Sequence, residues 1–517
     1  MKEAVKKQVT IRRGPLTFDD VLAVAARRAE IVLDPEVLPP MRRSRAVVET
    51  ALTEGQVVYG VTTGFGALAN TRIDPTEASA LQLRLVRSHA AGVGDPLPDP
   101  LVRAMLLLRA RTLAQGYSGV RPLVVERYLD FLRLDLLPAV PDRGSVGASG
   151  DLAPFAHLAL PLVGEGLLRV DGVVTPAREA LERAGLKPIV LEAKEGLSLL
   201  NGTEGMLAWG VLALDRARRL TRAADIACAL SIEALMGSAR PFRPEIHALR
   251  PHPGQIDSAR NVARLVQGSG IGSSHADDFT HAVQDAYSLR CAPQVHGACR
   301  DALSHAANVF ERELGAIVDN PIILFETGEV ISAGNFHGQP LAVALDLMAI
   351  ALTDLASISE RRIDRMLDPG HSSGLPAFLA VKPGLMSGYM LAQYTAAALV
   401  AECRVLSHPA SVESIPTSGS QEDHVSMGWG AARKLWEVLE SVTRVLAVEL
   451  LCAAQGVEFR APLEPAPSTG AALGAVRAIA PRLVEDRPLG EEIEAMTAAI
   501  ERGDVERTVE SVSGPLA

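Results

Sequence analysis

The chain has 517 residues, of which 48% are hydrophobic and 22% charged, and these ordinary globular proportions exclude a disordered or collagen-like protein. Acidic residues outnumber basic ones by 61 to 51, for a formal net charge of −10, which argues against sequence-independent nucleic-acid binding because that binding needs a cationic face. Aromatic residues make up only 4% while Ala and Leu are abundant, so the composition favours a mostly helical protein.

The amino-terminal segment MKEAVKKQVTIRRGPLTFDD contains no apolar stretch long enough for a signal peptide, so we expect a cytoplasmic protein. The cysteines are odd in number and widely spaced, which argues against a disulfide framework. His296 lies between Cys291 and Cys299, but these three ligands leave a zinc site one ligand short. We therefore expect no metal.

Helical periodicity first appears in residues 98–116, PDPLVRAMLLLRARTLAQG. The pattern places apolar residues on one side and several arginines on the other, with Pro at the start and Gly at the end. Residues 125–138 show a similar pattern that stops at a Pro. Two amphipathic helices are therefore expected in this part of the chain.

Longer helical signals follow toward the carboxyl end, over residues 204–239, 258–268, 279–314, 340–365, 387–405 and 425–455. Helices that are apolar on most sides must be buried on most sides, by each other or by another subunit. The longest uncharged stretch, 383–401, contains polar residues and Gly, so a buried helix suits it better than a membrane span. The pattern indicates an oligomeric helical bundle without a membrane segment.

Gly-, Ser- and Asn-rich loops interrupt these helices, and such loops often display active-site groups. They are YGVTTGFGALAN (59–70), GSVGASGDLAPFAH (144–157), LLNGTEG (199–205), SAGNFHGQP (332–340) and SIPTSGSQEDH (414–424). Two other glycine-rich patterns carry little weight. GHSSG (370–374) matches a hydrolase nucleophile elbow but lacks the preceding strand, and GSGIG (268–272) follows a helix and lacks the Walker Lys.

The tripeptide Ala148-Ser149-Gly150 has the capacity to cyclise, although a flexible turn is the simpler interpretation of a Gly-rich loop. Because Gly150 has no side chain, its amide nitrogen can reach the carbonyl carbon of Ala148 in a tightly bent backbone. Two dehydrations, one of which removes the Ser149 hydroxyl, would leave a five-membered ring with an exocyclic methylene. That product, 4-methylidene-imidazole-5-one, is a strong electrophile that no standard side chain supplies.

The chain resembles the aromatic amino-acid ammonia-lyases and aminomutases from about residue 16 to about residue 510, through YGVTTGFG, GSVGASGDLAPFAH, LLNGTEG, QDAYSLRCAPQVHG, DNPI, GNFHGQP and HPASVESIPTSGSQEDHVSMG. The resemblance implies an all-α, elongated helical bundle of the ammonia-lyase/fumarase-like type. It implies an N-terminal domain (1–200) that carries the electrophile and a central and C-terminal bundle (201–517). It also implies a homotetramer with active sites shared between subunits, and a ring formed autocatalytically from Ala148, Ser149 and Gly150 without metal or external coenzyme.

The same resemblance implies roles for residues in other loops. Tyr59 matches the base that takes the substrate β-proton, and Asn201 matches an Asn that contacts the electrophile and the substrate. Arg290 matches the Arg that binds the substrate carboxylate, for which a planar guanidinium is suited. On a helical reading Gln284 and Tyr287 share a face with Arg290, with Gln284 implied in substrate binding and Tyr287 in catalysis.

The side-chain pocket resembles that of the histidine-specific members of the family. Five residues follow that pattern: His89 in RSHAAGVG, Phe336 and His337 in GNFHGQP, Glu422 in QEDH, and Met390. A buried carboxylate facing an imidazole N–H gives specificity, because a phenyl ring would leave it unpaired at a cost of about 1–3 kcal/mol. The implied reaction converts L-histidine to trans-urocanate and ammonia, the first step of histidine degradation.

The chain departs from the usual family pattern at a few positions. Glu204 stands where Gln is usual, Ala286 replaces a common Pro, Cys403-Arg404 replaces Asn-Lys, and DPGHSSG is atypical. None of these removes a group from the expected mechanism. Two alternatives stay open at this point: a phenylalanine or tyrosine lyase or aminomutase on the same scaffold, and a catalytically inactive helical scaffold or binding protein.

Overall fold

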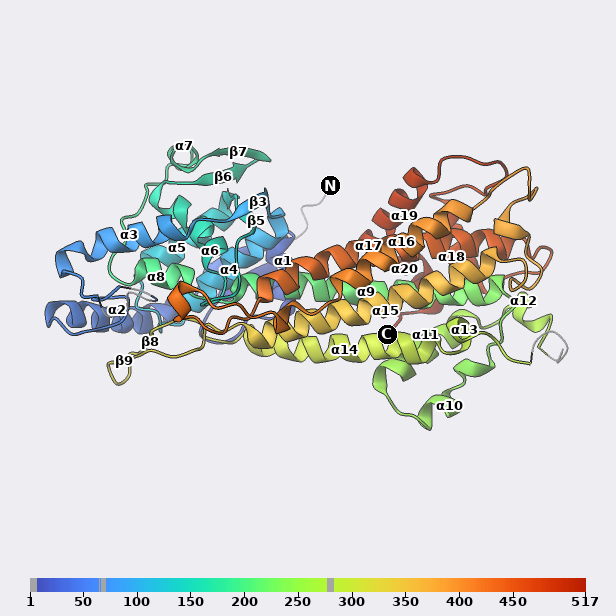
Figure 1. Ribbon diagram of the computed structural model, residues 1–517, viewed down its shortest axis with the longest axis horizontal. Coiled ribbons are helices and arrows are strands. Elements are labelled where there is room, and N and C mark those ends of the chain that lie inside the picture. The colour runs from blue at the N-terminus through green and yellow to red at the C-terminus, as the bar shows by residue number, and fades with distance from the viewer. Residues whose placement is uncertain (1–6, 65, 67–70, 277–282) are drawn as a thin grey trace. The chain divides into compact units, whose positions relative to one another are not determined.

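A computed structural model describes residues 7–64, 66, 71–276 and 283–517 of the chain (Figure 1). The chain divides into two compact units. The first comprises Met1–Leu212, Ala307–Leu345 and Pro409–Arg433, and the second comprises Ala213–Ala306, Asp346–His408 and Lys434–Ala517. Helices that contribute residues to both units are α9 (Glu204–Ala234), α14 (Ala292–Glu313), α15 (Gln339–Leu367) and α17 (Gly428–Glu458).

The first unit combines helices with short strands. Its other α-helices are α1 (Phe18–Ala25), α2 (Leu38–Thr53), α3 (Ala78–His89), α4 (Asp99–Ala114), α5 (Pro122–Arg133), α6 (Leu152–Ala159), α7 (Ala177–Arg183) and α8 (Glu195–Leu200). Its strands are β1 (Lys7–Ile11), β2 (Ala29–Leu33), β3 (Val93–Pro96), β4 (Leu137–Pro138), β5 (Pro141–Arg143), β6 (Leu167–Val170), β7 (Val173–Pro176), β8 (Ile322–Leu324) and β9 (Glu329–Ile331). Its 3-10 helices are Pro35–Val37, Pro75–Glu77, Leu160–Val163, Ala410–Val412 and Ser418–Ser420.

The strands of the described residues form only small sheets. Strands β1 and β2 pair in parallel, with Val9 opposite Ile31. The largest sheet is three-stranded and antiparallel, in the order β4-β6-β7, and β3 with β5 and β8 with β9 form antiparallel pairs. Helices therefore supply most of the core, and the expected helical bundle is confirmed.

Helix α4 lies at the centre of the first unit and contacts α1, α5 and β4 (Figure 1). Its residues from Leu101 onward are all buried, so the expected outward-facing arginine side is wrong. Arg103, Arg109 and Arg111 are each at most 4% exposed. These arginines can be buried because carbonyl oxygens accept their hydrogen bonds. For example, Arg111 Nη2 donates to the carbonyl oxygen of Gly14 at 2.7 Å, and a buried charge is tolerated where acceptors satisfy it.

The second unit has helices and loops but no strand among its described residues. Its other α-helices are α10 (Pro244–Ala248), α11 (Pro253–Leu265), α12 (Gly270–Ser273), α13 (Tyr287–Arg290), α16 (Met390–Leu406), α18 (Pro467–Arg477), α19 (Gly490–Arg502) and α20 (Asp504–Ser513), and its 3-10 helices are Arg240–Phe242 and Ala377–Leu379. Helix α20 packs against α18 and α19, and α11 packs against α10 and α18.

A buried carboxylate, Asp225 of α9, joins three segments of the second unit. It accepts hydrogen bonds from Ser258 Oγ at 2.6 Å, Asn261 Nδ2 at 2.9 Å, His296 Nδ1 at 2.7 Å and Arg300 Nη2 at 2.7 Å. Because a carboxylate only accepts, Nδ1 of His296 carries the proton. Burial opposes ionisation, but the Arg300 charge and the hydrogen bonds outweigh it and hold the pKa of Asp225 below its ordinary value.

The helical signals at 204–239, 340–365 and 425–455 are confirmed by α9, α15 and α17. The signal at 279–314 is not one helix: α13 ends at Arg290, and α14 begins at Ala292, while residues 277–282 lie outside the described residues. Pro293 accounts for the break, because a proline without an N–H suits the first turn of a new helix and not a helix interior.

Helix α15 is, in the described part of the chain, the one helix long and apolar enough to cross a membrane by length and composition. Of its most apolar window, 67% is buried inside the protein. The core helix of a soluble protein meets the same criterion, so this helix is weak evidence for a span. The nucleophile-elbow alternative is excluded, since Ser372 is fully buried and follows a helix rather than a strand.

Candidate active site

The Ala148-Ser149-Gly150 tripeptide forms a tight turn between β5 and α6 in the first unit. Ser149 has φ +50° and Gly150 has φ +81°, so two consecutive residues are left-handed. That conformation costs a non-glycine residue about 1–3 kcal/mol and persists only where the surroundings hold it. Ala148 and Gly150 are buried and Ser149 is half-buried.

Gly202 holds this turn through its main chain. Its N–H donates to Ser149 O at 3.3 Å, and its carbonyl oxygen accepts the N–H of Asp151 at 2.7 Å. A Cβ on Gly150 would lie 1.9 Å from the Gly202 oxygen, so only glycine fits there. The bent backbone without a side chain at Gly150 fits the ring that the tripeptide is expected to form.

Buried groups on either side fix the turn further. Asp151 is fully buried, and its Oδ2 accepts the N–H of Met206 at 2.9 Å. Burial raises the pKa of Asp151 well above its ordinary value. On the other side, the N–H of Met427 donates to Val146 O at 2.9 Å. The turn is therefore held by the segments that begin α9 and α17.

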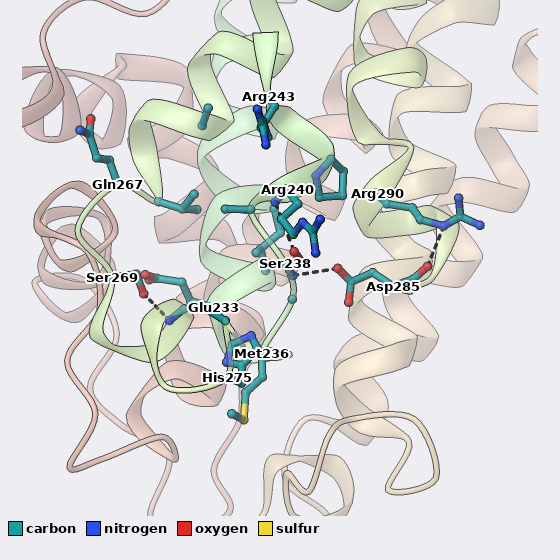
Figure 2. Close-up of a pocket in the computed structure, with 18 of the residues that line it drawn as sticks. Glu233, Met236, Ser238, Arg240, Arg243, Gln267, Ser269, His275, Asp285 and Arg290 are labelled. Atoms are coloured by element: carbon teal, nitrogen blue, oxygen red, sulfur yellow. Dashed lines mark hydrogen bonds between the residues drawn. The ribbon is translucent and has the colours of Figure 1, made fainter. Parts of the chain in front are cut away.

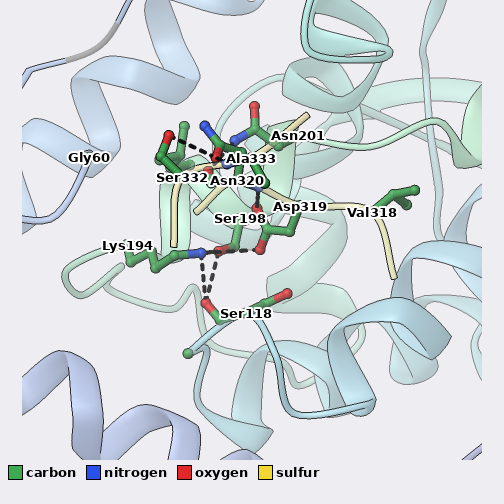
Figure 3. A network of polar contacts seen from close by, with 12 residues as sticks. Gly60, Ser118, Lys194, Ser198, Asn201, Val318, Asp319, Asn320, Ser332 and Ala333 are labelled. Carbon is green, nitrogen blue, oxygen red and sulfur yellow. Dashed lines mark hydrogen bonds and ion pairs between the residues drawn. The ribbon is translucent and has the colours of Figure 1, made fainter. Parts of the chain in front are cut away.

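Asn201 ends α8 directly before Gly202 and is 2% exposed. Its Nδ2 donates to the carbonyl oxygen of Asn320 at 2.7 Å (Figure 3). The Asn320 side chain in turn accepts from Ser332 Oγ at 3.2 Å and from the N–H of Ala333 at 2.9 Å. These bonds fix the amide of Asn201 beside the turn.

A buried lysine braces the same region. Lys194 Nζ lies 3.1 Å from Asp319 Oδ2, 2.8 Å from Ser198 Oγ and 3.0 Å from the carbonyl oxygen of Ser118 (Figure 3). Burial lowers the pKa of Lys194, and the charge of Asp319 opposes that fall. The network joins α8 to the segment that leads to Asn320.

The Tyr59 loop contacts the loop that carries Glu422. The Tyr59 hydroxyl accepts the N–H of Gly66 at 3.1 Å. A Cβ on Gly66 would lie 2.4 Å from Ser418 Oγ, which shows how closely the two loops approach. Residues 65 and 67–70 of this motif lie outside the described residues.

The structure brings His89 and Glu422 within electrostatic range of each other. His89 ends α3, and its Nδ1 lies 2.9 Å from Leu85 O. Burial lowers the pKa of His89, while the Leu85 contact and the Glu422 charge oppose that fall. Glu422 Oε2 accepts the hydroxyl of Thr417 at 2.8 Å. The charge of Glu422 therefore acts on His89, and the segment that carries Glu422 contacts the Tyr59 loop.

Phe336 is half-buried in the same unit. The next residue, His337, stacks on His424, with ring centroids 5.8 Å apart and an interplanar angle of 7°. Its Nε2 lies 3.1 Å from His424 O. The segment carrying Phe336 is therefore attached to the segment carrying Glu422.

The other expected site residues, Gln284, Tyr287, Arg290 and Met390, belong to the second unit. Tyr287 is 71% exposed, and the Arg290 guanidinium lies 4.5 Å from its ring centroid. Helix α13 begins at Tyr287, and Gln284 precedes it, so the shared helical face is wrong for Gln284. Met390 begins α16 and is half-buried.

Gln284 and Arg290 line a cavity of about 1040 Å³ in the second unit (Figure 2). Arg240 and Glu233 also line it. Arg290 Nε donates to the carbonyl oxygen of Asp285 at 2.9 Å, and this bond orients its side chain. The cavity is large enough for an amino acid, and Arg290 supplies a cation suited to a carboxylate.

Sequence reasoning did not single out Arg109, Asp151 or Gly202. Asp151 and Gly202 each directly follow an expected site residue in GASGD and NGTEG, and that adjacency was the available signal. No motif marks Arg109, whose helix was expected to expose its arginines. Among the described residues, no group of three or more His, Cys, Asp or Glu side chains could hold a metal ion.

Residues 16–478 match the aromatic amino acid lyase family. A protein of Gloeobacter violaceus named histidine ammonia-lyase is 52% identical over 501 residues, which cover 97% of this chain and 97% of that protein. One of Anaeromyxobacter sp. (strain K) with the same name is 51% identical over 498 residues, which cover 95% of this chain and 98% of that one.

Two solved structures show the same fold over nearly the whole chain. Tyrosine aminomutase from Streptomyces globisporus has a TM-score of 0.93 at 40% identity and covers 99% of this chain and 100% of its own. Histidine ammonia-lyase from Trypanosoma cruzi has a TM-score of 0.89 at 41% identity and covers 98% of this chain and 95% of its own. With the family matching most of its length, the chain belongs to the aromatic amino acid lyases and is a carbon–nitrogen lyase.

Proposed function

We propose that the chain eliminates ammonia from L-histidine to give trans-urocanate, the first step of histidine degradation. The observation that carries this is the Ala148-Ser149-Gly150 turn, which is left-handed at Ser149 and Gly150 and held against Gly202. Two observations support histidine as the substrate. Relatives named histidine ammonia-lyase are 52% and 51% identical, and the charge of Glu422 acts on His89.

The turn has the atoms needed to form 4-methylidene-imidazole-5-one. The Gly150 nitrogen forms a bond to the Ala148 carbonyl carbon, and the Ala148 oxygen leaves as water with the amide protons of Gly150 and Ser149. The Ser149 hydroxyl and α-proton then leave as a second water. These steps release no electrons and need no oxidant. When formed, the ring supplies an electrophile that captures the substrate amine and makes it a better leaving group.

Side chains of this protein bind the substrate and move its proton. The Arg290 guanidinium binds the α-carboxylate, with Gln284 beside it. The Tyr59 hydroxyl oxygen takes the β-proton, and the N–H of Gly66 that donates to this oxygen holds the side chain in place. Tyr287 is assigned to catalysis, and Asn201, Phe336 and Met390 to substrate binding, by the family resemblance.

His89 and Glu422 set the choice of substrate. The Glu422 carboxylate accepts a hydrogen bond from the imidazole N–H of the substrate, and His89 lines the same pocket. A phenyl ring offers no N–H, so it would leave Glu422 desolvated and unpaired. The tyrosine aminomutase neighbour at 40% identity makes an aromatic amino acid the competing substrate to test.

Glu422→Ala should lower kcat/KM for L-histidine by about 10- to 100-fold, or about 1.4–2.7 kcal/mol of transition-state binding, and spare any activity on L-phenylalanine. Steady-state kinetics with both substrates measure this. Asp423→Ala is the matched control, because it removes the neighbouring exposed acid and should keep kcat/KM for histidine. An unchanged kcat/KM for L-histidine in Glu422→Ala would remove Glu422 from the specificity pocket.

We also propose that the enzyme is a cytoplasmic homotetramer with active sites shared between subunits, acting on a small molecule and binding neither nucleic acid nor membrane. The family resemblance supports the tetramer and the division into domains 1–200 and 201–517, and the net charge of −10 supports the absence of nucleic acid. Sedimentation equilibrium should give the mass of four chains, and the mass of one chain would contradict the tetramer.

A further inference from the structure

A buried ion pair packs directly against Gly202. Arg109 Nη1 lies 2.6 Å from Glu204 Oε1, and the two side chains are 0% and 4% exposed. Arg109 also donates to the carbonyl oxygens of Ser198 and Val318. The ion pair therefore joins the central helix α4 to the start of α9. Arg109 also joins α4 to α8 and to the segment that leads to Asn320.

Gly202 contacts this ion pair and the Ala-Ser-Gly turn at once. A Cβ on Gly202 would lie 2.1 Å from Glu204 Oε2 and 2.2 Å from Arg109 Nη1, so the ion pair fills the space of a side chain. Through its main chain, the same glycine donates to Ser149 O at 3.3 Å and accepts from Asp151 at 2.7 Å. The ion pair therefore packs directly against the residue that bonds to the turn.

Stability alone is a poor explanation for a buried ion pair in this place. Removing two charges from water costs about as much as their attraction returns, so apolar residues of similar volume often stabilise a protein equally well. A strained turn, by contrast, needs neighbours that cannot back away. Arg109 and Glu204 supply such a support at the residue whose main chain bonds to Ser149 and Asp151.

We propose that Arg109 and Glu204 are positioning residues that hold Gly202 against Ser149 and Gly150 and so accelerate ring closure. This inference rests on the proposed function. The Gly150 nitrogen forms its bond to the Ala148 carbonyl carbon only when the turn stays bent, and holding reacting atoms in place lowers the entropy cost of that step. The two waters then leave as described above.

Glu204→Ala removes the carboxylate that packs against Gly202. In full-length chains freshly made by cell-free synthesis, intact mass followed over time gives the rate at which two waters are lost. We expect this rate to fall about tenfold, which corresponds to about 1.4 kcal/mol. Glu449→Ala is the matched control. Glu449 pairs with Arg362 at 2.5 Å in the second unit, both side chains are 0% exposed, and this variant should lose its waters at the wild-type rate.

Each outcome separates this inference from the proposed function. If the wild-type chain never loses two waters, the proposed function fails. If it does, and Glu204→Ala loses them equally fast, the positioning role is wrong. Equal slowing in Glu204→Ala and Glu449→Ala would also overturn it, by indicating a general effect of stability. Should Glu204→Ala lack a cooperative melt, the double variant Arg109→Met/Glu204→Met replaces the pair by apolar side chains, and a folded double variant that matures at the wild-type rate contradicts the role.

Discussion

Ser149→Ala should lower kcat on L-histidine by more than about 1,000-fold, equivalent to about 4 kcal/mol of transition-state stabilisation, while the chain keeps its fold. The variant lacks the Oγ that leaves in the second dehydration. The main-chain oxygen of Ser149 accepts the hydrogen bond from Gly202 that holds it in the turn, and alanine retains that oxygen. Kinetics, a thermal melt and intact mass test this together, with two waters missing from the wild type and at most one from the variant.

Ser145→Ala is the control for Ser149→Ala, because it removes the same atom from the same loop. Ser145 Oγ accepts the N–H of Gly147 at 3.2 Å, so its loss should cost about 1 kcal/mol of unfolding free energy and leave turnover and the two-water loss in place. Wild-type turnover by Ser149→Ala would rule out an electrophile formed from this tripeptide.

Asp225→Ala should destabilise the second unit by about 3–5 kcal/mol. The substitution removes the acceptor of four hydrogen bonds and leaves the Arg300 charge and the N–H of His296 without their partner. Asp215→Ala, on the same helix, is the control. Asp215 pairs with Arg219 where both side chains are more than a third exposed, and such pairs contribute about 0.5 kcal/mol. Chemical denaturation measures both, and equal losses would contradict a special role of Asp225.

The Asp225 network also predicts loss of stability in acid. The folded-state pKa of Asp225 is lowered, so its contribution is present above about pH 4 and is lost as the pH falls toward the folded value. Burial lowers the pKa of His296 as well, so the unfolded chain takes up a proton first below about pH 6.5. The difference in Tm between the wild type and Asp225→Ala should therefore shrink as the pH falls below about 4, and a difference that stays constant down to the acid transition would contradict this role of Asp225.

The helices of the core were predictable from the sequence because long apolar periodic segments must be buried. Residues 204–239, 340–365 and 425–455 show this, since they match α9, α15 and α17. The environment of α4 was not predictable. Its arginines follow the pattern of an exposed face, and only the carbonyl oxygens of distant loops, such as Gly14 for Arg111, make their burial possible.

The site was predictable where its chemistry is local in the chain. The Ala-Ser-Gly tripeptide indicates a capacity to cyclise, because a glycine must follow the serine for the ring to close. The contacts that hold the turn come from Gly202 and, behind it, Arg109 and Glu204. These contacts join segments far apart in the sequence, and no local pattern of residue types specifies them.

The most direct test of the account is a product assay on the purified protein with L-histidine, L-phenylalanine and L-tyrosine side by side. The account predicts trans-urocanate and ammonia from L-histidine and no product from the other two. Cinnamate, coumarate or a β-amino acid would contradict the reading of His89 and Glu422 while keeping the electrophile. No product from any substrate, together with an intact mass that lacks no water, would contradict the account at its centre.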